Sequence, residues 1–179
     1  MIRLTKNDVN FQAALWATNE IMGKPERDER REHILYWYVT DDKLMKTNGK
    51  YISIADIEPA TQFENDTFYE VIKRTKSEII LDKIECDSDY PDYKMCTDCE
   101  SDYDRENYAG KDTIDSTIAF ILQETGAVYS IEALHKCIKE IEYGYAKVIK
   151  DNQDTPVCIE RSLNGNGMKA QTYLMPKRR

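Results

Sequence analysis

The 179-residue sequence lacks the marks of a membrane protein and of a disulfide-stabilised secreted protein. No apolar run approaches the roughly 18 residues that a membrane-spanning helix needs, and the N-terminus has no hydrophobic signal core. The five cysteines are an odd number, in a chain too long to depend on disulfides for its stability. We therefore expect a cytoplasmic protein with no membrane partner.

Catalytic motifs are also missing. The chain has two histidines, no glycine-rich phosphate loop, no G-x-S-x-G turn and no H-E-x-x-H helix. Carboxylates are abundant, but no pattern pairs two of them on a defined scaffold. We expect a non-enzymatic protein without a cofactor, apart from the structural zinc considered below.

Basic residues are fewer than acidic residues, and the difference comes from one segment of the chain. The chain has 25 Lys and Arg against 33 Asp and Glu, a net charge of −8. Residues 60–115 hold 16 acidic and 7 basic side chains, a net of −9, so the rest of the chain has a net of +1. Because phosphate contacts need clustered cations, the overall charge argues against a nucleic-acid binder, whereas the near-neutral remainder of the chain is not excluded from that function.

The N-terminal part predicts a strand followed by a helix. Thr5 and Asp8 form a capping-box pattern at the helix start, and the Gly-Lys-Pro at 23–25 ends it. Between them, apolar residues recur at helical spacing: Phe11, Leu15 and Met22.

Three strands are expected next. Residues 34–39 are rich in aromatic and branched side chains, which favours a buried strand. Asp41 and Asp42 make a turn into the strand at 43–46. Asn48 and Gly49 then predict a hairpin turn into the strand at 51–55, because Asn-Gly accepts positive φ at both central positions.

The C-terminal part repeats this order. Residues 118–122 are expected to form a strand, and Ser130 caps an amphipathic helix that ends at Gly144. Strands follow at 145–149, 156–160 and 172–175. The prediction is an α+β protein of one domain, residues 1–179. It has two βαβββ halves (1–59 and 114–179) and an acidic insertion at 60–113.

Two passages carry a family resemblance. Residues 39–44 leading into the Thr-Asn-Gly-Lys at 47–50 resemble a hairpin of the bacterial DNA polymerase sliding clamps, which has Asp where Asn48 stands. Residues 156–159 with the terminal Tyr-Leu-Met-Pro-Lys-Arg at 173–178 are similar to the last strands and tail of those clamps. The resemblance covers roughly 120 residues, about one clamp domain, whereas a bacterial clamp chain carries three.

The resemblance implies a fold, a mechanism and partners. Clamp domains form a closed ring with helices inside, which encircles double-stranded DNA and contacts phosphates without reading the sequence. If each chain supplies one domain, the ring needs about six copies of the chain and is therefore a homo-oligomer. The clamp tail also lines a cleft for peptides from polymerases and clamp loaders. The residues that match this cleft by position are Val157, Tyr173, Leu174, Met175 and Pro176.

The candidate DNA-facing residues are basic side chains after the first helix, in the first hairpin and on the second helix. A solvated charged surface is the alternative, since acidic residues such as Glu132 and Glu140 lie nearby. The candidates are Lys24, Arg27, Arg30, Arg31, Lys50, Lys136 and Lys139. Met175 and Pro176 also have an alternative, because a proline blunts an ordinary edge strand.

The acidic segment holds a C-x2-C pair, Cys96 and Cys99, with Cys86 upstream. Thiolates at this spacing can share one zinc ion, which predicts a structural zinc site, although a lone C-x2-C is a weak signal. The acidic run at 87–104 can instead imitate DNA phosphates or bind a basic partner. Its composition favours a solvated or disordered loop.

Two functions therefore remain open. The first is a replication-associated, DNA-binding clamp-like protein. The second is a protein-interaction or regulatory module that uses the clamp fold without encircling DNA, with the acidic insertion contacting a basic partner or holding zinc.

Overall fold

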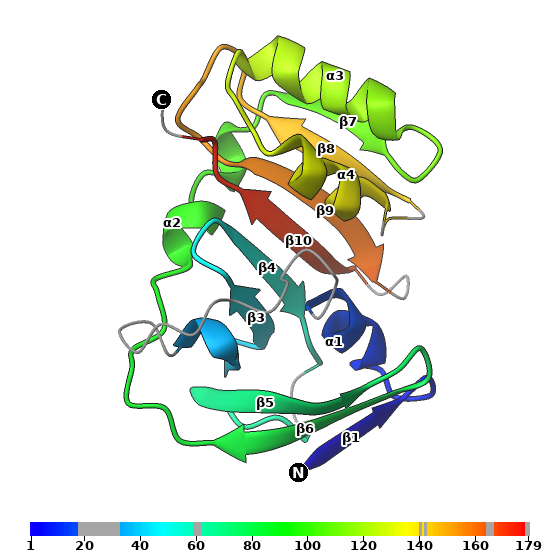
Figure 1. Cartoon of the computed structure of the whole chain (residues 1–179), viewed down its shortest axis with the longest axis vertical. Helices are drawn as coiled ribbons and strands as arrows, with labels where there is room; N and C mark the ends of the chain where they lie inside the picture. Colours follow the sequence, from blue (N-terminus) through cyan, green and yellow to red (C-terminus); the bar gives the residue numbers. More distant parts are fainter. Residues whose placement is uncertain (18–32, 59–61, 140, 142, 164–166, 178–179) are drawn as a thin grey trace. The chain divides into compact units, whose positions relative to one another are not determined.

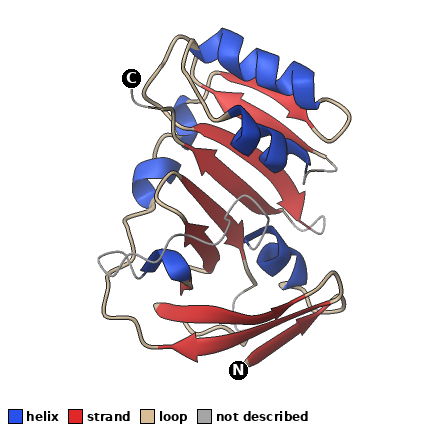
Figure 2. Cartoon of the chain, in the orientation of Figure 1, coloured by secondary structure: helices blue, strands red, loops and turns tan. Residues whose placement is uncertain are grey.

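The structure, a computed structural model, describes residues 1–17, 33–58, 62–139, 141, 143–163 and 167–177. The chain divides into two compact units. The first unit is Met1–Gly49, Ser53–Pro91 and Leu163–Ala170, and the second is Lys50–Ile52, Asp92–Ser162 and Gln171–Arg179. Figure 1 labels the elements, and Figure 2 separates helices from strands.

The first unit contains one helix and antiparallel strands in the order β1-β6-β5-β2-β3-β4, of which β4 belongs to this unit from Ser53 onward. Helix α1 (Phe11–Ala17) packs against β3 and β6 and buries Phe11 and Trp16 there. The strands are β1 (Ile2–Thr5), β2 (Trp37–Thr40), β3 (Lys43–Thr47), β4 (Tyr51–Asp56), β5 (Thr67–Arg74) and β6 (Glu78–Ile84).

The predicted capping box forms hydrogen bonds but does not cap the helix. The Asp8 carboxylate accepts from the Thr5 N–H and the Thr5 hydroxyl, both at 2.7 Å, which lowers the pKa of Asp8. These bonds close a turn, and α1 begins only at Phe11, whose N–H donates to Asp8 O at 3.0 Å. The predicted helix end at 23–25 lies outside the described residues.

The first hairpin forms, with two corrections. Strand β2 begins at Trp37 and not at residue 34, because residues 33–35 form a 3₁₀ turn. The aromatic composition of this stretch does not indicate that turn. Asp41 and Asp42 are the turn residues that both have positive φ, 49° and 55°. In the next turn only Gly49 has positive φ (83°), and its N–H donates to Thr47 Oγ1 at 3.0 Å.

The expected insertion, residues 60–113, contributes strands β5, β6 and β7 (Arg105–Ala109) to the sheet, which corrects its separation from the two predicted halves. Strands β5 and β6 form a hairpin between β1 and β2: β6 pairs with β1, and β5 pairs with β2. The buried side chains of Tyr69, Ile79 and Leu81 hold this hairpin in the core of the first unit. The buried residues are grouped at the start of each strand, Thr67–Tyr69 in β5 and Glu78–Leu81 in β6, and the charged residues that follow are mostly exposed.

The second unit has the strand order β10-β9-β8-β7, with helices α3 and α4 against the strands (Figure 2). Its first strand, β7, lies at 105–109, inside the expected insertion. Residues 118–122 belong to α3 rather than to a strand, since Ile118 and Ile121 are buried at helical spacing. The elements are β7 (Arg105–Ala109), α3 (Ile114–Thr125), α4 (Ile131–Lys139), β8 (Gly144–Val148), β9 (Val157–Leu163) and β10 (Met168–Leu174).

The two halves therefore exist with shifted boundaries. The first half is β1-α1-β2-β3-β4 with the β5–β6 hairpin added, and the second half is β7-α3-α4-β8-β9-β10. Helix α3 lies along β7, because Thr117 Oγ1 donates to Tyr108 O at 3.1 Å. No helix among the described residues is long and apolar enough to cross a membrane.

Candidate peptide pocket at the C-terminal segment

The chain end after β10 is fixed by backbone hydrogen bonds within the second unit. The Met175 N–H donates to Lys50 O at 3.2 Å, and the Lys177 N–H donates to Val128 O at 2.7 Å. Pro176, between them, has no N–H to satisfy. The tail is therefore held beside the linker that joins α3 to α4.

That linker, residues 126–130, presents one apolar side chain to solvent. Gly126 ends α3 in the left-handed conformation, with φ of 63° and its N–H on Leu122 O at 3.1 Å. Tyr129 is 3% exposed and its hydroxyl donates to Thr155 O at 3.1 Å, and burial raises its pKa to about 12. Val128, between these anchored residues, is 46% exposed.

A loop before β9, residues 149–156, forms the third wall. Asp151 has φ of 55°, and its N–H donates to Glu124 O at 2.7 Å at the end of α3. The Asn152 side chain accepts from the N–H groups of Asp154 and Thr155 at 3.0 and 3.1 Å. These bonds set the loop that carries Gln153 and Asp154.

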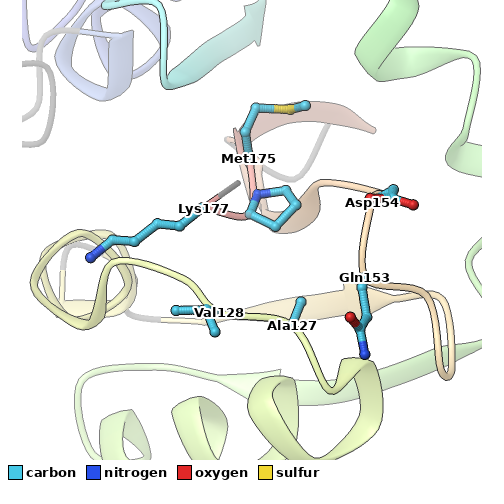
Figure 3. Close-up of a pocket in the computed structure, with 7 residues that line it drawn as sticks. Ala127, Val128, Gln153, Asp154, Met175 and Lys177 are labelled. Carbon is cyan, nitrogen blue, oxygen red and sulfur yellow. The ribbon is translucent and has the colours of Figure 1, made fainter. Parts of the chain in front are cut away.

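The three segments enclose a pocket of about 310 Å³. Figure 3 shows Val128 and Ala127 on one side, Met175 above them, and Gln153 and Asp154 on the loop. Met175 and Val128 are each 46% exposed and give the pocket its apolar surface. Gln153 adds an amide, and Asp154 and Lys177 add opposite charges. The lining residues are Ala127, Val128, Gln153, Asp154, Met175, Pro176 and Lys177.

Two of the five residues expected in a peptide cleft line this pocket, Met175 and Pro176. Val157, Tyr173 and Leu174 are at most 1% exposed and support the core behind it. The residues that sequence reasoning missed come from the linker and the loop. The signal in the sequence is Val128 itself, an apolar residue in the short segment between Gly126 and the helix cap Ser130.

A polar network lies under the tail, in the second unit. The Glu100 carboxylate accepts from Gln171 Nε2 at 2.7 Å and from the Tyr173 hydroxyl at 2.5 Å. Gln171 also donates to Glu160 at 2.9 Å, and Lys147 pairs with Glu160 at 2.9 Å. Burial, followed by nearby negative groups including Glu100, raises the pKa of Tyr173. The acidic run at 100–104 is thereby attached to β10.

The cysteines of the predicted zinc site are in the reduced state, and the Cys99 thiol donates to Cys96 O at 2.8 Å. Burial raises the pKa of the Cys96 thiol to about 11. Across the described part of the chain, no group of three or more His, Cys, Asp or Glu side chains could hold a metal ion. Zinc at Cys86, Cys96 and Cys99 stays a prediction for metal analysis.

The expected DNA-facing residues are separated. Lys24, Arg27, Arg30 and Arg31 lie outside the described residues. Lys139 is exposed at the end of α4, and Lys136 pairs with Glu132 at 2.8 Å. Lys50 is exposed between β3 and β4. Helices α1, α3 and α4 together carry three acidic and two basic side chains, so their surface has no excess of positive charge.

Several solved structures are similar to this chain. It matches the Helicobacter pylori beta clamp with a TM-score of 0.56 at 12% identity, over 99% of this chain and 66% of the clamp. It matches DNA polymerase III subunit beta of Borrelia burgdorferi (0.57, 12%, 99% and 64%) and the Bacillus subtilis DNA polymerase sliding clamp (0.56, 10%, 99% and 64%).

These likenesses confirm the clamp-like α+β fold that the sequence predicts. The identity is too low to carry more than the fold, and the chain spans about two thirds of the length of each of these clamps. No protein-family model matches the chain, and no curated protein matches it.

Proposed function

We propose that this chain is a non-enzymatic, clamp-fold binding protein of the DNA replication machinery, and that its tail pocket holds a short segment of a partner protein. The carrying observation is the 310 Å³ pocket, in which the exposed side chains of Met175 and Val128 meet. Solved neighbours named as polymerase sliding clamps supply the link to replication.

The lining chemistry favours binding over catalysis. The pocket has aliphatic, thioether and proline surface, one amide, one carboxylate and one ammonium group, with no hydroxyl, thiol or imidazole side chain in its lining. Short peptides bind such grooves with apolar side chains, while backbone or charged groups fix their orientation. Asp154 and Lys177 supply the orienting charges.

Small aromatic compounds provide a direct probe of the pocket. Structures of the Helicobacter pylori clamp hold 5-chloroisatin or 3,4-difluorobenzamide, and we expect either compound to shift the Met175 methyl resonance saturably in ¹³C-methyl-methionine NMR spectra. Met175→Ala is expected to weaken binding about fivefold, or about 1 kcal/mol, because half-exposed apolar surface is lost.

Met95→Ala is the matched control, since Met95 is 80% exposed in α2 (Lys94–Thr97) and does not line the pocket. It should leave the affinity unchanged. Resonance shifts at Met95 with none at Met175 would contradict the proposed pocket.

Contact with double-stranded DNA is the second candidate function, favoured by the clamp fold and by the exposed Lys139 on α4. The near-neutral helix surface limits this contact to a few phosphates. We expect Lys136→Glu/Lys139→Glu to weaken duplex binding and to flatten its salt dependence, since each lost phosphate contact lowers the slope by about 1. Fluorescence anisotropy with a labelled duplex across a salt series measures this, and unchanged binding removes α4 from the interface. Light scattering tests the ring of about six copies.

A further inference from the structure

The β5–β6 hairpin, which extends the first clamp-like half, ends in a tightly hydrogen-bonded turn at residues 75–78. The Thr75 N–H donates to Glu78 O at 2.8 Å, and the Glu78 N–H donates back to Thr75 Oγ1 at 3.0 Å. The Ser77 N–H also reaches Thr75 Oγ1, at 3.3 Å. The turn therefore has a defined shape, with Lys76 and Ser77 exposed at its tip.

Positive charge is concentrated at this tip. Lys73, Arg74 and Lys76 are three cations within four residues, a denser group than any other in the described part of the chain. Arg3 joins them, because β1 pairs with β6 and places Thr5 opposite Glu78 at the same end. Figure 1 shows the hairpin turn and the end of β1 together.

One carboxylate lies among these cations. Glu78, 9% exposed, accepts from Arg3 and from Lys73 at 2.5 Å each, so it fixes both side chains near the turn. Lys6 and Asp8, which follow Thr5 at the same end, add one charge of each sign, so five cations against two carboxylates leave a net charge of +3. The three hairpin cations are hard to recognise in the sequence because they lie within residues 60–115, whose net charge is −9.

We propose that the tip of the β5–β6 hairpin (Arg3, Lys73, Arg74, Lys76 and Ser77) binds the phosphate backbone of double-stranded DNA. Glu78 holds Arg3 and Lys73 in place, Arg74 and Lys76 are exposed at the end of β5 and in the turn, and the Ser77 hydroxyl can donate to a phosphate oxygen. This site goes beyond the proposed pocket and is independent of it. It does not involve the helix residues considered above.

An anionic membrane is the competing surface for a basic tip. Ile72, at the bulge of β5, is 56% exposed close to the turn. A single aliphatic side chain adds little membrane affinity, since stable anchoring combines charge with a large buried apolar area. The Thr75 hydroxyl donates to Glu78 O within the turn, so the exposed Ser77 hydroxyl is the one next to the cations that suits a phosphate oxygen. DNA is the partner that the charge and the turn favour.

The test compares two double variants in duplex binding at low salt and across a salt series. Arg74→Ser/Lys76→Ser should weaken binding about tenfold and lower the salt slope by about 2, because two phosphate contacts are lost. Lys111→Ser/Lys150→Ser removes the same charge from exposed positions of the second unit and should leave binding within about twofold of the wild type. Equal losses in both variants would overturn the proposal.

A variant that is expected to bind the duplex more tightly gives an independent test of the site. Glu78→Gln removes the central negative charge and keeps an oxygen acceptor for Arg3, so duplex affinity should rise severalfold. A fall in affinity at unchanged helical circular dichroism would argue against the site. Wild-type protein that binds phosphatidylserine-containing vesicles but not the duplex would assign the tip to membranes and overturn the DNA proposal.

Discussion

Gly144→Ala is expected to lower the free energy of unfolding by about 3 kcal/mol. A Cβ at this position would lie 2.2 Å from Glu160 O and 2.9 Å from Ile141 Cγ2. The first neighbour is backbone of β9, which pairs with β8 through Gly144 opposite Arg161. Relief of the clash requires β8 and β9 to separate, and the ladder beneath the tail would weaken.

Gly167→Ala is the control for this prediction. Gly167 has φ of 77°, but a Cβ there meets nothing within 4 Å. Only backbone strain is added, at a cost of about 1 kcal/mol. Urea denaturation of the three proteins should therefore rank the wild type first, Gly167→Ala second and Gly144→Ala last. A Gly144→Ala protein as stable as the wild type would mean that β8 and β9 can accommodate a side chain.

Gly144 also has a structural role that the sequence alone does not predict. A glycine after an amphipathic stretch is typical of a helix end, and α4 was predicted from Leu134 and Ile138, which are both buried. The real requirement on Gly144 is the approach of a neighbouring strand, which only the folded chain shows. The last three strands are predictable because short stretches with aromatic or branched residues, such as Tyr145, Val157 and Tyr173, lie between turn residues.

The predictions that the structure corrects have a common cause, which is that they rest on local composition. Residues 118–122 are a short apolar run, and such a run suits a strand or a buried helix face equally well. The charged segment at 67–84 is expected to be part of an insertion, although its strands contain short apolar runs, at 68–69 and 79–81, that are mostly buried. These runs place the strands in the core, and the net charge of the segment describes only its exposed side chains.

The pocket was predictable only in part for a related reason. Met175 and Pro176 stand out because they follow a strand at the chain end. Val128 and Gln153 join them only through long-range hydrogen bonds, such as Lys177 N–H to Val128 O. No local pattern encodes such a meeting, so a binding site formed by three loops becomes visible only in the structure.

The stability of the first unit is expected to rise between about pH 8 and pH 10.5 through one residue, Lys46. Lys46 is 9% exposed on β3, its ammonium group donates to Leu35 O at 3.0 Å, and it lies 5.6 Å from the centre of the Trp37 ring. Burial lowers its pKa to about 8 from the ordinary 10.5. Below pH 8 the charged amine is buried at a cost, because water solvates it better in the unfolded chain.

The sign follows from proton binding. Between pH 8 and 10.5 the unfolded chain keeps the proton on Lys46 while the folded chain has released it, so raising the pH favours folding. A lowering of the pKa from 10.5 to about 8 corresponds to about 3 kcal/mol. Other groups titrate in the same range, and the difference between wild type and Lys46→Met isolates this residue.

Urea denaturation at pH 7.5 and pH 10 measures that difference. At pH 7.5, the free energy of unfolding of Lys46→Met is expected to exceed that of the wild type. By pH 10 this difference should have fallen by about 2 kcal/mol. Lys139→Met, at an exposed position of α4, should follow the wild type at both pH values. If Lys46→Met also follows the wild type, the amine is solvated in the folded protein, and the packing of Trp37 and Leu35 around it is looser than the structure shows.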